Sequence, residues 1–502
     1  MKKIVINIVL AAAALVLAAS CNLDQKPQTA ISSADAMESA ADVEHFRYGL
    51  YSASKYVFSG AYTYCPDLQT DLYHALVGFG NFNGAFYHYD VTATESTCAS
   101  VWYNLYGYIA NANFLIEGAQ KLLETNELSK EDTQKVKLYY GEACFFRAFF
   151  HYNLVQYFCK AYDAATAETT FGVPVVTKYA PTALAETYPH RGTIGATYAQ
   201  ILADLEEAAA TITTEGKADN IWISKDAVTA LQARVALSMG NYLTAYEKAK
   251  AVIETGTYPL ESDAAKYAAG WEEDTLGESV WQPQIVDNTD SGSSYMYFIY
   301  NTTGDDNPQY VPEDKWLDQF ASDDIRRAAY FDERTITTPC AGTITLLVKY
   351  PGNPTICSTG SNKYINRPKV FRISEMYLIA AEAGAIVGKE DANELLNTLR
   401  RARIPSYSSR TYSGEALLNQ IKAGRTKELF GEGFRLFDLK RWDEGFKRSA
   451  GQVTSMVRQE ERYANYEVQA GDYRLVWPIP QAEIDANPQM KGEQNEGYLD
   501  QK

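Results

Sequence analysis

Long stretches of helical periodicity constrain the fold of this chain more than any other feature of its sequence. Apolar residues recur at spacings of three and four, the pattern of helices that bury one face, through residues 101–124, 130–158, 193–212 and 223–254. Gaps rich in Pro, Gly and Thr separate these stretches. We therefore expect a mainly α protein.

The ends of these helices are also marked. Thr193 and Ser224 have side chains suited to the N-cap, and Gly256 with Pro259 ends the fourth stretch. Within residues 223–254 a Gly-Asn-Tyr break separates two segments rich in small residues, which predicts two antiparallel helices in close contact. Residues 371–387 and 392–403 form a similar pair.

These pairs resemble the tetratricopeptide pattern, in which small residues let neighbouring helices nest. The expected architecture is a tetratricopeptide-like scaffold of helical pairs with long irregular loops and a few short β-strands, the clearest strand being in residues 343–350.

The first residues have the character of an export signal. Lys2 and Lys3 precede an almost unbroken apolar run over residues 4–19, which is short for a membrane-spanning helix and typical of a secretory signal. Cys21 follows directly after small residues, a pattern that resembles the lipobox of bacterial lipoproteins, although Ala18 stands where that pattern favours Leu. We expect residues 1–20 to be removed and Cys21 to carry a lipid anchor; the alternative is an ordinary signal with a chance cysteine.

The charge of the chain excludes one class of partner. The formal net charge is −17, so the chain lacks the basic surface that nucleic-acid phosphates require. Anionic lipid headgroups would also repel it. A lipid tether at Cys21 is therefore the expected route to a membrane.

Three segments between the helices have a different composition. They cover residues 60–100, 281–316 and 335–370, and the first two mix Tyr, Phe, Asn, Asp and Gly too densely for a core. The chain has 37 tyrosines against 20 phenylalanines and 7 tryptophans; tyrosine joins a flat apolar ring to a hydrogen-bonding tip and suits wet binding surfaces. Loops on a rigid scaffold are common places for binding.

Signatures of catalysis and of metal binding are missing from the sequence. G-x-S-x-G, H-E-x-x-H and Walker motifs are absent, and the five histidines are scattered. His151 lies on an apolar helix face and is expected in the core. The sequence leaves open whether Asp305-Asp306 or Asp323-Asp324 binds calcium, but calcium binding is not predicted. No cofactor is expected. A glycosidase needs only two carboxylates about 5 to 10 Å apart, and Asp67 with Asp71 is the first pair to test.

Six cysteines follow Cys21. Cys144 and Cys159 are 15 positions apart in one predicted helix, about 22 Å at 1.5 Å per residue, too far for a disulfide; both are expected as buried thiols. Cys65 with Cys98, and Cys340 with Cys357, flank loop-like segments, and the sequence leaves open whether they pair.

Two blocks in the last third carry a family resemblance. RTKELFGEGFRLFDLKRW (425–442) and YRLVWPIPQAEIDANPQMKGEQNEGY (473–498) resemble the SusD/RagB family of nutrient-binding lipoproteins of the Bacteroidetes outer membrane. FRISEMYLIAAEA (371–383), LNTLRRAR (396–403) and the Leu23-Asp24 start after Cys21 agree with it, whereas Gly424 replaces a usual Glu. The resemblance covers nearly the whole chain, and the matching blocks occur in the same order as in the family. We expect two regions, an N-terminal one over residues 21–260 and a C-terminal one over residues 261–502.

The blocks themselves are expected to stabilise the fold rather than bind ligand. Opposite charges three apart (Arg425 with Glu428, Glu432 with Arg435, Asp438 with Arg441) predict neighbours on a helix surface, each worth tenths of a kcal/mol if exposed. Gly431 and Gly433 predict the end of one helix and the start of another. The Pro-Ile-Pro segment predicts an extended stretch lying across the helices.

The resemblance implies a non-enzymatic protein at the cell surface that binds a glycan and passes it to a SusC-like TonB-dependent outer-membrane channel. Sugar rings stack on aromatic rings while polar side chains bind their hydroxyls. Trp102 has helical spacing with Tyr106, so we expect it in the core and not among the ligand-binding residues. The ligand-binding candidates are Asp71, Tyr73, Phe79, Asn81, Phe82, Phe86, Tyr87, Tyr295, Tyr297, Tyr300 and Tyr310. The alternatives are a peptide-binding RagB-like importer subunit, a surface glycosidase, and an assembly adaptor that binds no nutrient.

Overall fold

The computed structural model describes residues 36–125, 127–286, 298–300, 306–357, 364–460 and 466–499, without the side chains of residues 298–300 and 306. The predicted signal segment, residues 1–20, and its Cys21 anchor lie outside the described residues. Among the described helices, none combines the length and the apolar character needed to cross a bilayer.

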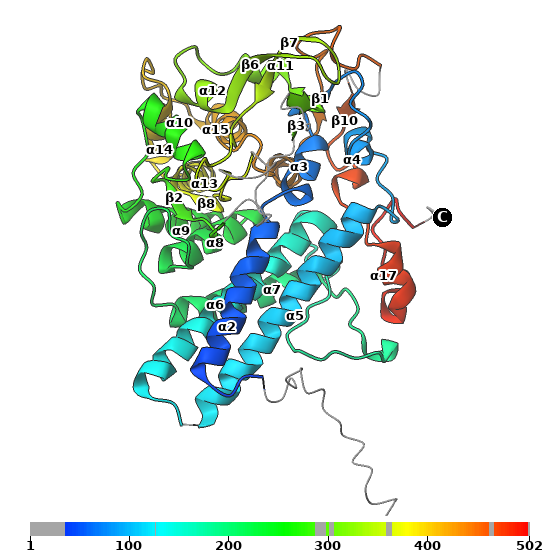
Figure 1. Cartoon of the computed structure of the whole chain (residues 1–502), viewed down its shortest axis with the longest axis vertical. Helices are drawn as coiled ribbons and strands as arrows, with labels where there is room; N and C mark the ends of the chain where they lie inside the picture. Colours follow the sequence, from blue (N-terminus) through cyan, green and yellow to red (C-terminus); the bar gives the residue numbers. More distant parts are fainter. Residues whose placement is uncertain are drawn as a thin grey trace, which may run out of the picture.

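Four long helices form one end of the molecule (Figure 1). Helix α6 packs against the other three, and the set consists of α2 (Ala40–Tyr56), α5 (Ser96–Thr125), α6 (Lys130–Phe158) and α7 (Ile194–Thr211). The periodicity predicted α6 to the residue and α5 and α7 to within a few residues. The Thr193 hydroxyl accepts a hydrogen bond from the Ala196 N–H, as expected of an N-cap.

The remaining large helices form the predicted antiparallel pairs. Helix α13 packs against α9, α14 and α15, and α8 packs against α9; the bounds are α8 (Lys225–Ser238), α9 (Tyr242–Glu254), α13 (Ile373–Ile386), α14 (Ala392–Arg403) and α15 (Gly414–Glu428). The break between α8 and α9 falls at Gly240, whose φ is 68°. Because α9 contacts α13, the packing crosses the expected boundary near residue 260. The mainly α fold with helical pairs is confirmed.

Most of the short strands lie at the opposite end, whereas the small helix α17 (Gln481–Ala486) lies beside the long helices (Figure 1). The described strands form two-stranded antiparallel sheets: β1 (Tyr73–Ala75) with β5 (Tyr310–Pro312), β2 (Ser279–Trp281) with β8 (Phe371–Arg372), β3 (Phe298–Tyr300) with β4 (Asp306–Pro308), β6 (Phe331–Ile336) with β7 (Gly342–Leu347), and β9 (Phe446–Lys447) with β10 (Glu467–Val468). The other small helices are α3 (Ala61–Leu68), α4 (Gly84–His88), α10 (Ala264–Glu272), α11 (Asp314–Leu317), α12 (Ile325–Tyr330) and α16 (Arg435–Trp442). The predicted strand in residues 343–350 corresponds to β7 and ends earlier.

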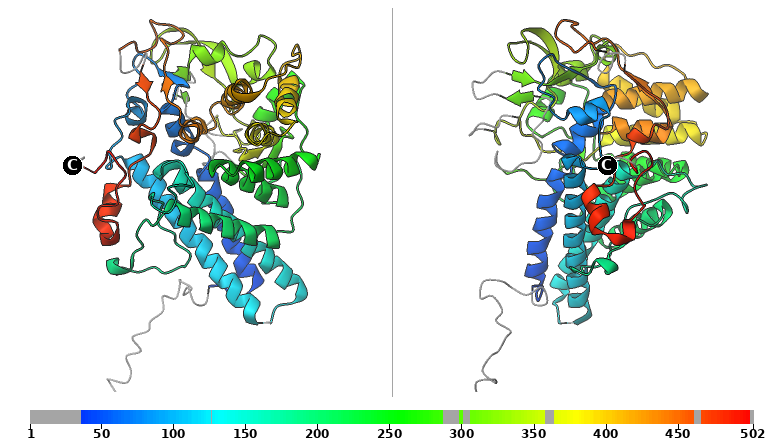
Figure 2. Two further views of the ribbon diagram at one scale, coloured as in Figure 1. Left: turned by 180° about the vertical axis from the view of Figure 1, so that it is seen from behind. Right: turned by 90° about the vertical axis from the view of Figure 1, so that its right-hand side faces the viewer.

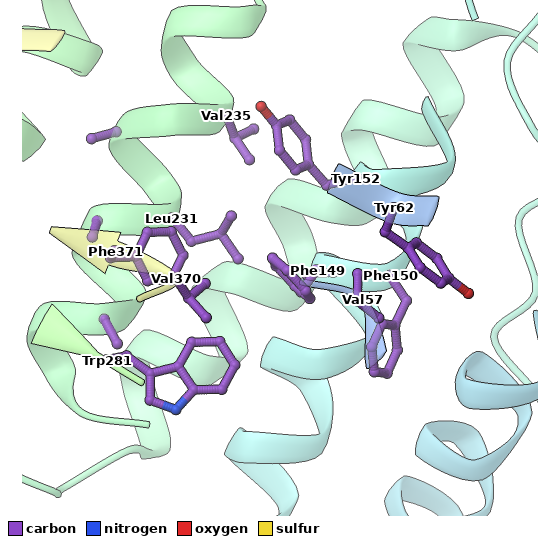
Figure 3. Packing of buried hydrophobic residues seen from close by; sticks show 14 of the residues in the cluster. Val57, Tyr62, Phe149, Phe150, Tyr152, Leu231, Val235, Trp281, Val370 and Phe371 are labelled. Carbon is purple, nitrogen blue, oxygen red and sulfur yellow. The ribbon is translucent and has the colours of Figure 1, made fainter. Parts of the chain in front are cut away.

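Aromatic rings join the two ends through a common core (Figure 3). The Trp281 ring lies 5.7 Å from the Phe145 ring and 6.2 Å from the Phe149 ring, both on α6. On its other side Trp281 lies 6.1 Å from Phe371. Trp102 is 1% exposed, which confirms its predicted place in the core. Burial of His151 lowers its pKa to about 4, so it is a neutral core residue, as expected.

The charged residues of 425–442 do not lie on a helix surface as the spacing predicted. The Arg425 Nε donates to both carboxylate oxygens of Asp438 at 2.9 and 2.8 Å. Glu428, fully buried, accepts hydrogen bonds from three guanidinium groups, of Arg326, Arg372 and Arg403. Burial opposes ionisation of Glu428, but the three arginines outweigh it and hold the pKa well below its usual value.

Only one of the three predicted pairs forms. Arg441 Nε lies 3.0 Å from Asp438 Oδ1, whereas Glu432 pairs with Lys349 and Arg372. The local prediction failed because these side chains turn inward, where desolvated charges need partners from several elements. The break predicted around Gly431 and Gly433 is confirmed, since α15 ends at Glu428 and α16 begins at Arg435.

The C-terminal segment lies beside the first helices (Figure 2). The Trp477 N–H donates to the Tyr157 carbonyl at the end of α6 at 2.8 Å, and the Trp102 indole donates to Glu483 of α17 at 3.3 Å. Buried Arg191 donates to the Asn495 side chain at 2.8 Å. The extended Pro-Ile-Pro stretch therefore lies across the helices, as its sequence predicted.

The described cysteines are all free thiols. Cys144 and Cys159 are buried, as expected. Neither Cys65 with Cys98 nor Cys340 with Cys357 forms a disulfide in the structure.

Candidate functional site

Strand pairing brings the first two aromatic segments together. In the β1–β5 ladder Ala75 lies opposite Tyr310 and Tyr73 opposite Pro312, although the two strands are far apart in sequence. The Tyr310 ring lies 5.6 Å from the Phe79 ring and 5.3 Å from the Tyr87 ring. Segments 60–100 and 281–316 therefore form one aromatic cluster at the strand-rich end of the molecule.

Most rings of this cluster are interior. The buried candidates are Asp71, Tyr73, Phe79, Phe86, Tyr87 and Tyr310, and Tyr73 and Tyr87 are 0% exposed. The expectation that residues 60–100 mix aromatic and polar residues too densely for a core is wrong, because these rings are buried and polar groups find partners inside: the Tyr89 hydroxyl donates to the Gln69 carbonyl. A sugar stacks only on an open ring face, so these covered rings cannot stack on a sugar in this structure. They support the site from beneath.

Two candidates reach the surface. Asn81 is exposed and Phe82 is half-buried. Both lie on the turn between β1 and α4, residues 77–83, here called the 77–83 turn. Asn81 adopts a left-handed φ of 57°, and its Oδ1 lies 3.1 Å from the His88 Nε2. The Phe82 ring lies 6.2 Å from the Tyr64 ring. This turn therefore holds an amide and an aromatic ring in fixed positions next to solvent.

The remaining candidates lie at or beyond the edge of the described residues. Tyr295 and Tyr297 lie outside them. Tyr300 is in β3, opposite Asp306 of β4, and its side chain is not described. Because β4 leads directly into β5, this hairpin continues the same strand-rich end as the 77–83 turn.

Arg448 supports the turn from below, and the sequence did not single it out. Its guanidinium donates to the carbonyls of Leu68, Thr70 and Tyr87 at 2.8, 3.0 and 2.8 Å and lies 3.8 Å from the centre of the Tyr87 ring. The side chain is 1% exposed. One buried cation thus fixes both flanks of the turn. Sequence offers no signal for it, because its partners are backbone carbonyls more than 300 positions away.

Asp67 and Asp71 have opposite electrostatic environments. Burial raises the pKa of Asp67 to about 7, against the hydrogen bond that it accepts from the Gly433 N–H. Burial also opposes ionisation of Asp71, but Arg435 and Lys315 outweigh it and lower its pKa to about 2. Both carboxylates are buried, 0% and 3% exposed, so a glycan cannot reach them in this structure, which is unfavourable for a glycosidase.

Metal-ligating groups do not gather in the part of the chain that the structure describes: no group of three or more His, Cys, Asp or Glu side chains could hold an ion there. Of the calcium candidates, Asp324 pairs with Arg326 at 2.7 Å and Asp323 accepts a hydrogen bond from the Ser406 N–H at 2.7 Å. Asp305 lies outside the described residues.

Two family models match this sequence. The model described as the SusD family matches residues 341–498, which include both C-terminal blocks. The model described as starch-binding, associating with the outer membrane, matches residues 22–237, which include the 77–83 turn. No curated protein matches the sequence.

Solved structures share the fold over nearly the whole chain. A SusD superfamily protein from Bacteroides thetaiotaomicron is 26% identical, with a TM-score of 0.77 over 91% of this chain and 99% of that one. A SusD-like carbohydrate binding protein from Bacteroides vulgatus is 19% identical, with a TM-score of 0.71 over 92% and 100% of the two chains. Surface glycan-binding protein A from Bacteroides fluxus is 19% identical, with a TM-score of 0.66 over 91% and 99%.

Proposed function

Since the chain belongs to the SusD/RagB family, we propose that it is a non-catalytic outer-membrane lipoprotein that binds an oligo- or polysaccharide and passes it to a SusC-like TonB-dependent channel. The observation that carries the proposal is the match of residues 22–237 to the model described as starch-binding and associating with the outer membrane.

The geometry supports capture of a glycan at the 77–83 turn. Asn81 offers an amide for sugar hydroxyls, and Phe82 offers part of a ring for a C–H face. The buried rings of Phe79, Tyr87 and Tyr310 hold the turn rigid, and a preorganised site loses less free energy on binding. The predicted contributions of Tyr295, Tyr297 and Tyr300 belong to the same proposal, since the β3–β4 hairpin leads into this cluster.

The membrane and channel parts of the proposal rest on family membership and on the N-terminal sequence. Acyl chains on Cys21 would hold the protein at the bilayer, at about 0.8 kcal/mol for each buried CH2. The channel would lie beside the bound glycan, with the protein facing the cell exterior. Labelling with an alkyne fatty acid should mark the protein in cells and should fail for Cys21→Ala.

The alternatives separate by simple measurements. A peptide-binding importer subunit would bind oligopeptides and no glycan. A glycosidase would shorten the glycan that it binds, a result that the burial of Asp67 and Asp71 disfavours. An adaptor would copurify with the channel and bind neither class of nutrient.

The direct test is titration of protein lacking residues 1–21 against a panel of polysaccharides and oligopeptides. Asn81→Ala with Phe82→Ala should weaken polysaccharide binding at least about tenfold, a loss of about 1.4 kcal/mol. The matched control is Tyr103→Ala, a 44% exposed aromatic on α5 that is not among the ligand-binding candidates and should leave affinity unchanged. Absence of binding to every glycan offered would contradict the proposal.

A further inference from the structure

A small cavity lies between the helix bundle and the C-terminal blocks. Its volume is about 90 Å³, and its wall includes residues of α3, α6, α8 and α16 but none of the 77–83 turn. Figure 3 shows four of its wall residues, Val57, Tyr62, Tyr152 and Val370, gathered from separate elements. An engineered cavity of about 150 Å³ in another protein binds benzene, so this smaller space suits a ligand of a few non-hydrogen atoms.

One buried charged group on this wall has an unused donor. Arg425 lines the cavity and is 2% exposed, and its Nε donates to the Asp438 carboxylate. Its Nη2 lies 3.8 Å from Glu375 Oε1. Its Nη1 is buried and has no hydrogen-bond partner among the described residues. A buried charged donor without a partner is costly, and a ligand that accepts a hydrogen bond from Nη1 would remove this cost.

A second guanidinium group lies next to the first. Arg234 donates to Glu375 through Nε and Nη2 and to the Val370 carbonyl through Nη2, which leaves its Nη1 without a hydrogen bond to the described residues. The guanidinium carbons of Arg234 and Arg425 lie 5.0 and 5.4 Å from the centre of the Phe434 ring. Two guanidinium groups, each with one unused nitrogen, are thus held together at one wall.

Cationic groups outnumber carboxylates among the side chains that line the cavity. The cations are Arg234, Lys369, Arg425 and Arg441, and the carboxylates are Glu432 and Asp438. Glu375 and Asp274, which pair with Arg234 and Lys369, do not line the cavity. Asp438 is shared between Arg425 and Arg441. A ligand therefore meets a positive surface, which favours an anion.

A smaller hollow gives an approach to the cavity from the α6 side. It shares Gln156 and Phe437 with the cavity and extends to Lys160, which is exposed. Its wall includes Lys440, whose Nζ donates to the carbonyls of Gln156 and Cys159 and forms no ion pair with a described carboxylate. An anion that enters from this side passes a cation without a carboxylate partner.

The apolar part of the wall narrows the class of anion. Val57, Leu237 and Val370 line the cavity and are buried. A carboxylate with a short hydrocarbon part fits both chemistries, because its oxygens accept charge-assisted hydrogen bonds from guanidinium groups and its carbon atoms contact the apolar side chains. A dianion such as phosphate would lose more hydration on entry and has no apolar part.

We infer that this cavity binds a small monovalent carboxylate, of the size of formate or acetate, whose oxygens accept hydrogen bonds from Nη1 of Arg425 and Nη1 of Arg234. The inference goes beyond the proposed function and does not depend on it, because the cavity and the 77–83 turn share no residue.

The first test is titration of protein lacking residues 1–21, whose described fold begins at residue 36, in a buffer without other carboxylates. Calorimetry should show binding of formate or acetate with a Kd of about 10 mM or tighter. At constant ionic strength the same anion should raise the melting temperature, since it binds the folded state. Sodium chloride and sodium phosphate are the comparison, and should bind at least about tenfold more weakly. Absence of formate and acetate binding, or tighter binding of chloride or phosphate, overturns the inference.

A charge change at the wall tests the place of binding. Gln156→Glu keeps the size of the side chain and adds a negative charge beside the cavity, so it should weaken carboxylate binding at least about tenfold. The matched control is Gln134→Glu, the same change at an exposed position of the same helix, which should alter affinity less than about twofold. Equal losses in the two variants would show that only the net charge matters and would overturn the assignment to this cavity.

A crystal structure of the wild-type protein with acetate supplies a readout that does not depend on the variants folding. Acetate density within hydrogen-bond distance of Arg425 Nη1 supports the inference, whereas water alone in the cavity, or acetate only elsewhere, overturns it. The two proposals fail separately. Asn81→Ala with Phe82→Ala should leave acetate affinity unchanged, and absence of all polysaccharide binding with acetate binding intact refutes only the proposed function.

Discussion

Asp71 and Arg435, 364 positions apart, form a bidentate ion pair in the interior: Arg435 Nε and Nη2 lie 2.9 and 3.2 Å from the two oxygens of the Asp71 carboxylate. Lys315 Nζ lies 2.8 Å from the same carboxylate. The pair fixes α16 against the segment that leads into β1, and so connects a C-terminal family block to the proposed glycan-binding turn.

We expect Arg435→Met to lower the free energy of unfolding by about 3 kcal/mol, the low end of the range for removing one partner of a buried pair, because Lys315 still faces Asp71. Arg401→Met is the control: Arg401 pairs with Glu394 on the surface, where both side chains are exposed, and should cost less than about 1 kcal/mol. Urea unfolding measures both. Equal losses in the two variants would mean that the Asp71 pair contributes no more than a surface pair.

The raised pKa of Asp67 predicts a specific pH dependence. With a folded pKa of about 7 against an ordinary value of 3.8, the folded state holds the proton that the unfolded state releases between these values. This contribution to stability is therefore present at low pH and is lost as pH rises through about 7. Unfolding curves of the wild type and Asp67→Asn, measured from pH 4 to pH 8, should diverge by up to about 4 kcal/mol, with the wild type falling relative to the variant. Parallel curves would show that Asp67 ionises normally.

Gly433, two residues before α16, lies close to the backbone of α3. Its φ is 81°, and a Cβ there would lie 3.0 Å from the Thr63 Cα; its N–H also donates to Asp67. Gly433→Ala should therefore destabilise the protein by both strain and overpacking, whereas Gly492→Ala, at φ 87° in open space, adds strain alone. Thermal unfolding should show that Gly433→Ala is less stable than Gly492→Ala by about 1–3 kcal/mol. Equal stability of the two variants would show that the contact with Thr63 does not affect stability.

Arg448 should affect both stability and glycan binding. Arg448→Met leaves three buried carbonyls unpaired on the flanks of the 77–83 turn, so polysaccharide affinity should fall together with the melting temperature. Arg191→Met is the matched control, because Arg191 is 1% exposed and also donates to three carbonyls, those of Gly172, Glu493 and Phe158. It should destabilise similarly while affinity at a temperature where both variants are folded stays unchanged. If the polysaccharide affinity of Arg448→Met is unaltered, Arg448 does not position the 77–83 turn for binding.

The free thiols give a chemical check. Protein lacking residues 1–21 carries six cysteines, all unpaired in the structure, so thiol titration in denaturant without reductant should find six reactive groups. A count of four would indicate one disulfide, and comparison of Cys65→Ala with Cys340→Ala would then identify the loop that it closes.

Helical periodicity predicted much of the fold because it is a local property. The bounds of α6, the break at Gly240 and the caps of α7 and α8 follow from spacing and from side chains within a few residues. The partners of Arg425, Glu428 and Arg435 could not be predicted in this way. Each of these side chains has an opposite charge three positions away in sequence. Among the three predicted pairs only Asp438 with Arg441 forms at that spacing, and the other side chains pair with residues of other elements.

Which residues bind a ligand stays a prediction. Segments 60–100 and 281–316 meet through Ala75 and Tyr310, a contact that neither segment reveals by itself, and the density of tyrosine did not reveal which rings are covered. From sequence, a tyrosine such as Tyr310 is expected at the surface, because its hydroxyl needs a hydrogen-bond partner that water can supply. In the interior the carbonyl of Phe82 supplies that partner. Asn81 and Phe82 stay at the surface because the turn reverses there.

The hydrogen bonds from Trp477 to Tyr157 and from Arg191 to Asn495 have a consequence for biosynthesis. Residues 477–495 are synthesised well after α6, so the contacts that they make with the end of this helix cannot form until they have left the ribosome. A nascent chain that stops before residue 477 therefore lacks these partners of α6, and the native packing at this place is completed late in synthesis.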